Sequence, residues 1–328
     1  MTSYTSELES SNSKPFFTRE ALQEAEDELE KDGEFFLLPL RDRDHAEKHK
    51  NNNRGVGLHD PGPGEELRVN SITLTRNMAP LRKASCNRKH RCFQIASLTL
   101  GGPRLSLADL NAYMGEAMSR MRLPDADFEM HVRPFIDKNA AVFRLVDKVV
   151  CLGLGRLEGR LGTTSYPNGP MLQHSLVHMI AKRIEEIRKL TGTGQPEVTL
   201  YAQEPLYTRF DKDVLTMGSF NIVRGFGVKG FLLVDDKTMV ISQWPNFPLR
   251  EAVLDLSRPL VMWVQKKTSS TIGDPCDLHT RKIMDEEYDE ERVEGISGSV
   301  FPQNYWYTRK LRATAPDPPI LNDYKAFL

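Results

Sequence analysis

The sequence has few of the features that identify a protein class directly. Four cysteines in 328 residues are too few for a disulfide-stapled scaffold, and Cys151 lies inside an apolar run. No segment approaches the roughly 18 consecutive apolar residues of a membrane-spanning helix. The polar segment 1–14 also lacks the apolar core of a signal peptide. We therefore expect a protein of the cytoplasm, the nucleus or both, with no membrane as partner.

An excess of charge of one sign is also missing. Lys and Arg number 44 and Asp and Glu number 45, which gives a net charge of -1. Because dedicated nucleic-acid binders usually carry a strong basic excess, this balance argues against nucleic acid as a partner. The segment 76–91 holds six basic residues and no acidic one. A solvated loop is its simplest interpretation, with nucleic-acid binding and nuclear import left open.

The sequence also lacks recognisable catalytic and metal-binding motifs. It contains no G-x-S-x-G, Walker or kinase motif. Cys86, His90 and Cys92 do not have the spacing of a zinc site. His174 and His178 are four residues apart but lack the glutamate of the H-E-x-x-H motif. We therefore expect no metal, and enzymatic activity stays an open question.

What the sequence does have is an alternation of strand-like and helix-like segments between residues 147 and 268. Such alternation favours a parallel sheet with right-handed crossovers. The predicted fold class is α/β, with a Rossmann-like, doubly wound, mostly parallel five-stranded sheet and an N-terminal mainly helical extension. The predicted strands are 148–155, 198–202, 220–223, 238–242 and 260–264, and the predicted helices between them are 172–191, 209–217 and 249–256.

Composition divides the chain into four parts. They are a disordered tail at 1–14, an extension at 15–146 with a polar linker at 41–66, the Rossmann-like domain at 147–268, and an acidic, proline-containing tail at 269–328. In the extension we expect helices near 18–33 and 107–121 and a strand at 93–100. In the last part we expect a helix around 285–293, and Tyr305–Tyr307 as an aromatic cluster that docks back.

Glycines and polar residues follow three of the predicted strands. They are Gly153, Gly155 and Arg156 after the first strand, Gln203 and Glu204 after the second, and Ser242, Gln243 and Asn246 after the fourth. Because the carboxyl ends of parallel strands share one edge of the sheet, these residues are predicted to converge on a ligand. Glycine there permits positive φ and close approach of the backbone. The spacing G-x-G-x-x-x-G differs from the dinucleotide fingerprint, and the alternative is a turn that only lets the chain leave the sheet.

Several of these segments together resemble the "sensitivity to red light reduced" domain family in its fungal form. The resemblance covers roughly residues 147–266. The segments that carry it, in order, are Val150–Arg156, Gln173 near the start of the long helix, Tyr201–Tyr207, Asp235–Ser242, Pro245-Asn246 with Pro248-Leu249-Arg250, and Val253–Leu256.

This resemblance implies a Rossmann-like domain in a protein with a regulatory role, named for a plant light-signalling and circadian-clock component and without an established general reaction. The chain has Glu204 where many relatives have Asp, and Trp244-Pro245-Asn246 where many non-fungal relatives have a His-Cys pair. The leading hypothesis is a regulatory protein with an unidentified protein partner and a small nucleotide-like ligand. The alternatives are an S-adenosylmethionine-dependent methyltransferase-like enzyme and a ligand-free interaction scaffold.

Overall fold

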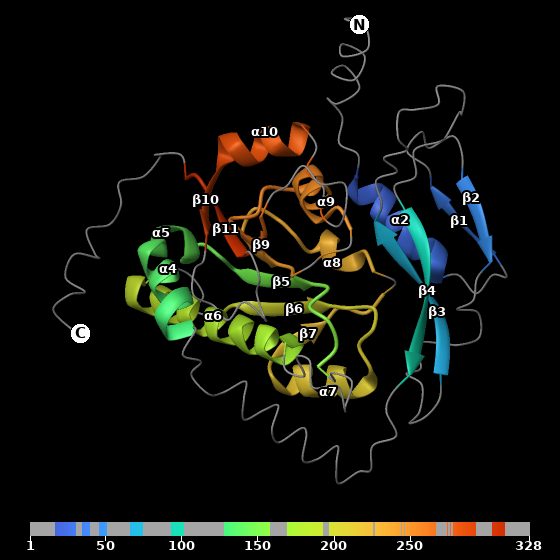
Figure 1. The fold of residues 1–328 in the computed structure, drawn as a ribbon, viewed down its shortest axis with the longest axis horizontal. Coiled ribbons are helices and arrows are strands. Elements are labelled where there is room, and N and C mark those ends of the chain that lie inside the picture. The colour runs from blue at the N-terminus through green and yellow to red at the C-terminus, as the bar shows by residue number, and fades with distance from the viewer. Residues whose placement is uncertain are drawn as a thin grey trace, which may run out of the picture.

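A computed structural model gives the fold of the chain (Figure 1). It describes residues 17–30, 35–39, 46–50, 66–74, 93–101, 128–157, 169–192, 197–225, 227–243, 245, 247–266, 274, 276, 278–292 and 304–311. The predicted tail 1–14, the basic segment 76–91 and the predicted helix 107–121 lie outside the described residues.

A seven-stranded sheet forms the centre of the fold (Figure 1). Its five parallel strands are β5 (Lys148–Leu152), β6 (Thr199–Gln203), β7 (Phe220–Ile222), β8 (Thr238–Ile241) and β9 (Val261–Gln265). They lie in the order β7-β6-β5-β8-β9, so β5 is central and the chain winds outward from it in both directions. This is the strand order of a doubly wound α/β sheet.

The predicted count of five strands is wrong, because two further strands extend the sheet beyond β9. They are β10 (Tyr288–Arg292) and β11 (Asn304–Arg309), and β11 lies antiparallel between β9 and β10. The sequence of β10 is YDEER, in which only Tyr288 is buried, so no apolar alternation announces a strand. Its order comes from pairing with β11, where Trp306 stacks on Trp263 with ring centroids 4.6 Å apart.

Helices cover both faces of the sheet. One hydrophobic core holds a π-helical turn, η1 (Phe128–Val132), and the helices α4 (Arg133–Lys138), α5 (Ala140–Phe143), α6 (Gly169–Thr191) and α7 (Arg209–Met217). The other core holds α8 (Lys229–Leu232), α9 (Leu249–Leu256), α10 (Leu278–Glu287) and α2 (Arg19–Glu30). The expectation of a helix around 285–293 is wrong for most of that range, because α10 ends at Glu287 and strand β10 follows it directly.

The two cores explain why β5 is an uninterrupted apolar run. Val149 and Cys151 face the core with α6, whereas Val150 and Leu152 face the core with α8 and α9. A strand covered on both faces has no position that favours a polar side chain. Continuous hydrophobicity in Lys148–Leu152 therefore marks a central strand.

The described part of the N-terminal region differs from the prediction of a mainly helical extension. Besides the helical elements α2, η1, α4 and α5 it contains two two-stranded antiparallel sheets. These sheets pair β1 (Phe35–Pro39) with β2 (Ala46–Lys50), and β3 (Glu66–Leu74) with β4 (Phe93–Gly101). The predicted strand 93–100 is confirmed as β4. β2 falls in the predicted polar linker because its sequence, AEKHK, is polar and becomes a strand only by pairing with the apolar β1.

Helix α2 is fixed to the domain by polar contacts as well as by apolar packing. The fully buried carboxylate of Glu26 accepts hydrogen bonds from the backbone N–H groups of Val228 (2.8 Å) and Lys229 (3.1 Å). The backbone N–H of Phe17 donates to Asp255 Oδ2 at 2.8 Å, and Arg19 donates to the carbonyl oxygen of Leu232 at 2.7 Å. These bonds join the start of the chain to α8 and α9.

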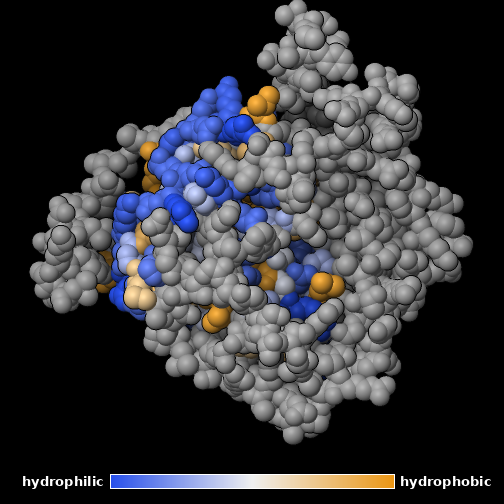
Figure 2. Space-filling view, in the orientation of Figure 1, coloured by the Kyte–Doolittle hydropathy of each residue, from blue (hydrophilic) through white to orange (hydrophobic). Residues whose placement is uncertain are grey.

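The described surface in Figure 2 is mainly hydrophilic, with apolar residues at isolated spots. The exposed large apolar side chains of the described residues include Met130, Leu190, Met217 and Leu278, which come from four different elements. Within the described residues, no helix combines the length and the apolar composition needed to cross a membrane.

Candidate functional site

The predicted site residues that the structure describes lie mostly at the carboxyl ends of three neighbouring strands. β5 pairs with β6 on one side and with β8 on the other, and Leu152 is level with Gln203. Ser242 follows β8 at the same level, because its hydroxyl donates to the carbonyl oxygen of Leu152 at 2.6 Å. The chain changes winding direction between β5 and β8, which is where doubly wound sheets bind their ligands.

The two glycines after β5 form a turn that needs glycine. Gly153 has a φ of 68° and Gly155 a φ of 80°, in the left-handed region that L side chains rarely adopt. A Cβ on Gly155 would also lie 3.3 Å from Cγ of Pro170, and one on Gly153 would lie 3.6 Å from the Phe247 ring. Both glycines therefore serve the turn by which the chain leaves the sheet, which was the alternative to ligand binding. Protein side chains fill the space beside both of them.

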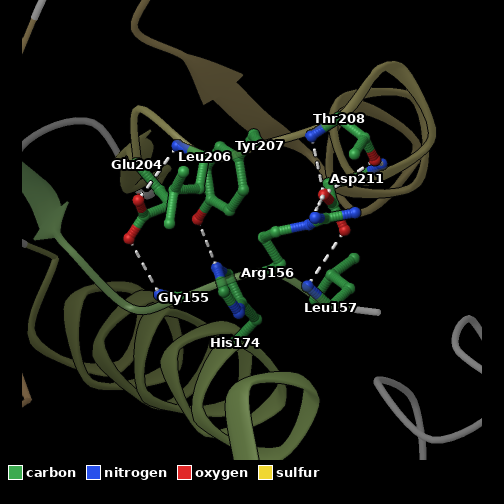
Figure 3. A network of polar contacts seen from close by, with 9 residues as sticks. All are labelled: Gly155, Arg156, Leu157, His174, Glu204, Leu206, Tyr207, Thr208 and Asp211. Carbon is green, nitrogen blue, oxygen red and sulfur yellow. Dashed lines mark hydrogen bonds and ion pairs between the residues drawn. The ribbon is translucent and has the colours of Figure 1, made fainter. Parts of the chain in front are cut away.

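Glu204 holds this turn against the end of β6 (Figure 3). Its Oε2 accepts from the N–H of Gly155 at 3.2 Å and its Oε1 from the N–H of Leu206 at 3.0 Å. Burial raises the pKa of Glu204 above its ordinary value, and these two hydrogen bonds offset the rise only in part. A carboxylate has about four lone-pair positions, so acceptor capacity remains for a ligand hydroxyl.

Asp211 is a second, fully buried carboxylate that organises the same turn (Figure 3). Its Oδ1 accepts from the N–H of Leu157 at 2.9 Å, and its Oδ2 accepts from the N–H of Thr208 at 2.7 Å. The Thr208 hydroxyl and the Asp211 carboxylate cap the first turn of α7 reciprocally. Arg156, predicted as a ligand-binding residue, places its Nε 3.7 Å from Asp211 Oδ2, so its charge is balanced within the protein.

His174 and Tyr207 form a buried pair next to this network (Figure 3). The Nδ1 of His174 lies 2.6 Å from the carbonyl oxygen of Pro170, which only accepts, so Nδ1 carries the proton. Nε2 then accepts from the Tyr207 hydroxyl at 2.6 Å. Burial lowers the pKa of His174 to about 4, so the ring is neutral at neutral pH. The pair ties the second turn of α6 to the loop after β6.

Gln203 is a predicted site residue that has an unused hydrogen-bonding group. Its Oε1 accepts from the N–H of Gly230 at 2.7 Å, which fixes the orientation of the amide. Its Nε2 is buried and has no hydrogen-bond partner within the described residues. A Cβ on Gly230 would lie 2.5 Å from that Oε1, so glycine is required for this approach of α8 to β6.

Gln243, which follows Ser242, is 3% exposed, and among the described residues neither its Oε1 nor its Nε2 has a hydrogen-bond partner. Of the remaining predicted residues, one lies on α6 and the others are not among the described residues. Gln173 is buried on the second turn of α6, the helix whose start contacts Gly155. Asn246 and Trp244 lie outside the described residues.

Three residues of this region make buried polar contacts that the sequence analysis did not predict. Asp211 had a detectable signal, because Thr208 and Asp211 have the spacing of a capping box. Arg250 and Asp274 had none, since they are 24 residues apart and form a buried ion pair with Nε and Oδ2 2.8 Å apart. Within the described part of the chain, no group of three or more His, Cys, Asp or Glu side chains could hold a metal ion.

A comparison with known families matches residues 130–315, more than half of the chain, to the SRR1 domain. The chain belongs to the SRR1 domain family. This confirms the resemblance to the sensitivity-to-red-light-reduced family that the motifs indicate. The SRR1 domain extends past both ends of the predicted 147–266, because it takes in α4 and α5 on one side and α10, β10 and β11 on the other.

Similarity to individual proteins is weak. No curated protein matches the chain. Among solved structures, Thermoplasma acidophilum protein 1320 is similar at 8% identity and a TM-score of 0.30, over 61% of this chain and 98% of that one. A mutant of MtNAS is similar at 13% identity and a TM-score of 0.29, over 61% of this chain and 70% of that one.

Proposed function

We propose that this SRR1 domain protein is a regulatory protein that binds a small nucleotide-like ligand at the carboxyl ends of β5, β6 and β8. The observation that carries the proposal is the unpartnered Nε2 of Gln203. Because Oε1 is fixed by the N–H of Gly230, Nε2 stays a donor held at the end of β6. A buried donor without a partner calls for a specific explanation, such as a bound molecule that completes it.

The position of Gln203 supports this explanation. Its backbone carbonyl accepts from the N–H of Gly153 at 2.9 Å, so Gln203 lies level with the glycine turn at the switch point of the sheet. Glu204, the next residue, keeps acceptor capacity after its two backbone hydrogen bonds. A donor and an acceptor on consecutive residues at the end of β6 are the groups that bind the hydroxyls of a ribose.

The test is isothermal titration calorimetry of the purified full chain against a panel of adenosine, guanosine, AMP, ATP, NAD and S-adenosylmethionine. The variant is Gln203→Glu, which keeps an acceptor for Gly230 and replaces the free donor with a carboxylate oxygen. We expect one panel member to bind the wild type and to bind this variant at least about tenfold more weakly. Absence of binding by every panel member would reject the proposal.

The regulatory part of the proposal concerns a protein partner in the cytoplasm or the nucleus. The buried thiol of Cys151 forms no disulfide, which supports a reducing compartment. Affinity purification with and without the ligand identified by calorimetry tests this part. We expect at least one protein to be retained differently in the two conditions, whereas identical retention would contradict a ligand-dependent regulator.

A further inference from the structure

Gln243 is the residue at this edge of the sheet whose burial is hardest to explain without a ligand. It is 3% exposed, and both its donor Nε2 and its acceptor Oε1 lack hydrogen-bond partners in the part of the chain that the structure describes. Burying a polar atom without a hydrogen bond costs free energy, so native proteins rarely retain such groups without a reason. An adjacent donor and acceptor on one amide are complementary to a ligand edge that offers an acceptor and a donor in the same plane.

Gln243 and Gln203 lie on opposite sides of β5. Leu152 is level with Gln203 in β6, and its carbonyl oxygen accepts from Ser242, the neighbour of Gln243. Parallel strands are spaced about 4.8 Å apart, so the backbones of the two glutamines are separated by about 10 Å. A base joined to a ribose can bridge that span, whereas one small hydrogen-bonding group cannot.

The charges at this edge restrict the ligand further. Its described charged groups include the carboxylates of Glu204 and Asp211, and the guanidinium of Arg156 lies against Asp211. This local charge repels a phosphate group. The same charge does not disfavour a neutral or a cationic ligand.

We infer that the site takes an adenine nucleoside without a phosphate, with Gln243 paired to the base and Gln203 donating to the ribose. A glutamine amide forms two hydrogen bonds with adenine, accepting from the amino group and donating to a ring nitrogen. This inference rests on the proposed function and narrows it to one ligand class, to which both adenosine and S-adenosylmethionine belong.

The test compares adenosine with inosine, in which a carbonyl replaces the amino group of the base. We expect adenosine to bind the full-length wild type at least about tenfold more tightly than inosine and than AMP. Gln243→Leu removes both hydrogen-bonding atoms, so adenosine binding is lost. Gln265→Leu is the matched control, because Gln265 ends β9, one strand further from β5, and its substitution leaves the affinity unchanged.

Thermal unfolding of the same variants gives a second measurement that needs no ligand. Because Gln243→Leu removes two unpartnered buried atoms, the ligand-free variant should melt at the same temperature as the wild type or higher. A clearly lower Tm would mean that Gln243 has partners within the protein, and would overturn the inference.

Binding of a panel ligand with no preference for adenine would also overturn it while leaving the proposed function intact. Failure of every ligand would reject both.

Discussion

The guanidinium of Arg250 and the carboxylate of Asp274 form an ion pair that is almost completely removed from water, with both side chains 1% exposed. The carboxylate also accepts from the backbone N–H of Arg250 at 3.0 Å, in the first turn of α9. Burial raises the pKa of Asp274 above its ordinary value in spite of the neighbouring guanidinium. The pair fixes the segment after β9 to the helix that follows β8.

Removal of one member of this pair is expected to be strongly destabilising. Asp274→Ala leaves the Arg250 charge buried without a counter-charge, which lowers the free energy of unfolding by about 3–5 kcal/mol. The double variant Arg250→Met with Asp274→Leu removes both charges and should recover most of that loss. Urea denaturation measures both effects. Arg133→Ala, which breaks the exposed pair with Glu129, is the control and should cost less than about 1 kcal/mol.

The buried pair of His174 and Tyr207 predicts a pH dependence of stability. The pKa of His174 is lowered to about 4 in the folded state, against about 6.5 for an exposed histidine. Below pH 6.5 the unfolded chain therefore binds a proton that the folded chain does not. The stability contributed by the neutral ring is complete above pH 6.5 and is lost as the pH falls toward 4, by up to about 3 kcal/mol.

The measurement is the free energy of unfolding between pH 7 and pH 5, where most carboxylates stay ionised. His174→Gln keeps an acceptor for the Tyr207 hydroxyl but does not titrate. We expect the wild type to lose up to about 2 kcal/mol more than this variant over that range. Parallel curves for the two proteins would show that His174 is not held neutral in the fold.

Gly155 is predicted to be required for stability through its conformation. Gly155→Ala combines a φ of 80° with a Cβ that would lie 3.3 Å from Pro170, so the free energy of unfolding should fall by about 1–2 kcal/mol. Gly169→Ala is the control, because nothing lies within 4 Å of its Cβ and it begins α6. Thermal melting of both variants decides. Equal Tm values would contradict the requirement for glycine at position 155.

The parallel strands were accessible to sequence reasoning because each carries its own signal. Lys148–Leu152 is a short apolar run ended by glycines, and Leu249–Leu256 begins after a proline that stops the preceding loop. Boundaries of this kind depend on residues that are neighbours in the chain. For this reason the five parallel strands and the helices at 169–191, 209–217 and 249–256 were all predicted close to their observed positions.

Elements that depend on distant partners were missed. The strand at Tyr288–Arg292 is acidic, and Ala46–Lys50 is polar, so neither sequence indicates a strand without its partner. The same holds for the site. Strand order alone predicted that Gly155, Glu204 and Ser242 lie at the same edge of the sheet. Their hydrogen bonds could not be predicted, because they depend on distances between residues far apart in the sequence. The unpartnered amide of Gln243 is likewise visible only in three dimensions.

The contact between Glu26 and Val228 has a consequence for the synthesis of the chain. The two residues are 202 positions apart. A ribosome adds roughly 5–20 residues per second, so on the order of ten seconds or more passes between the appearance of α2 and that of α8. During that interval Leu22 and Ala25 have left the ribosome before the core that buries them exists. Helix α2 is therefore made early and packs late, and a nascent-chain chaperone has long access to it in the meantime.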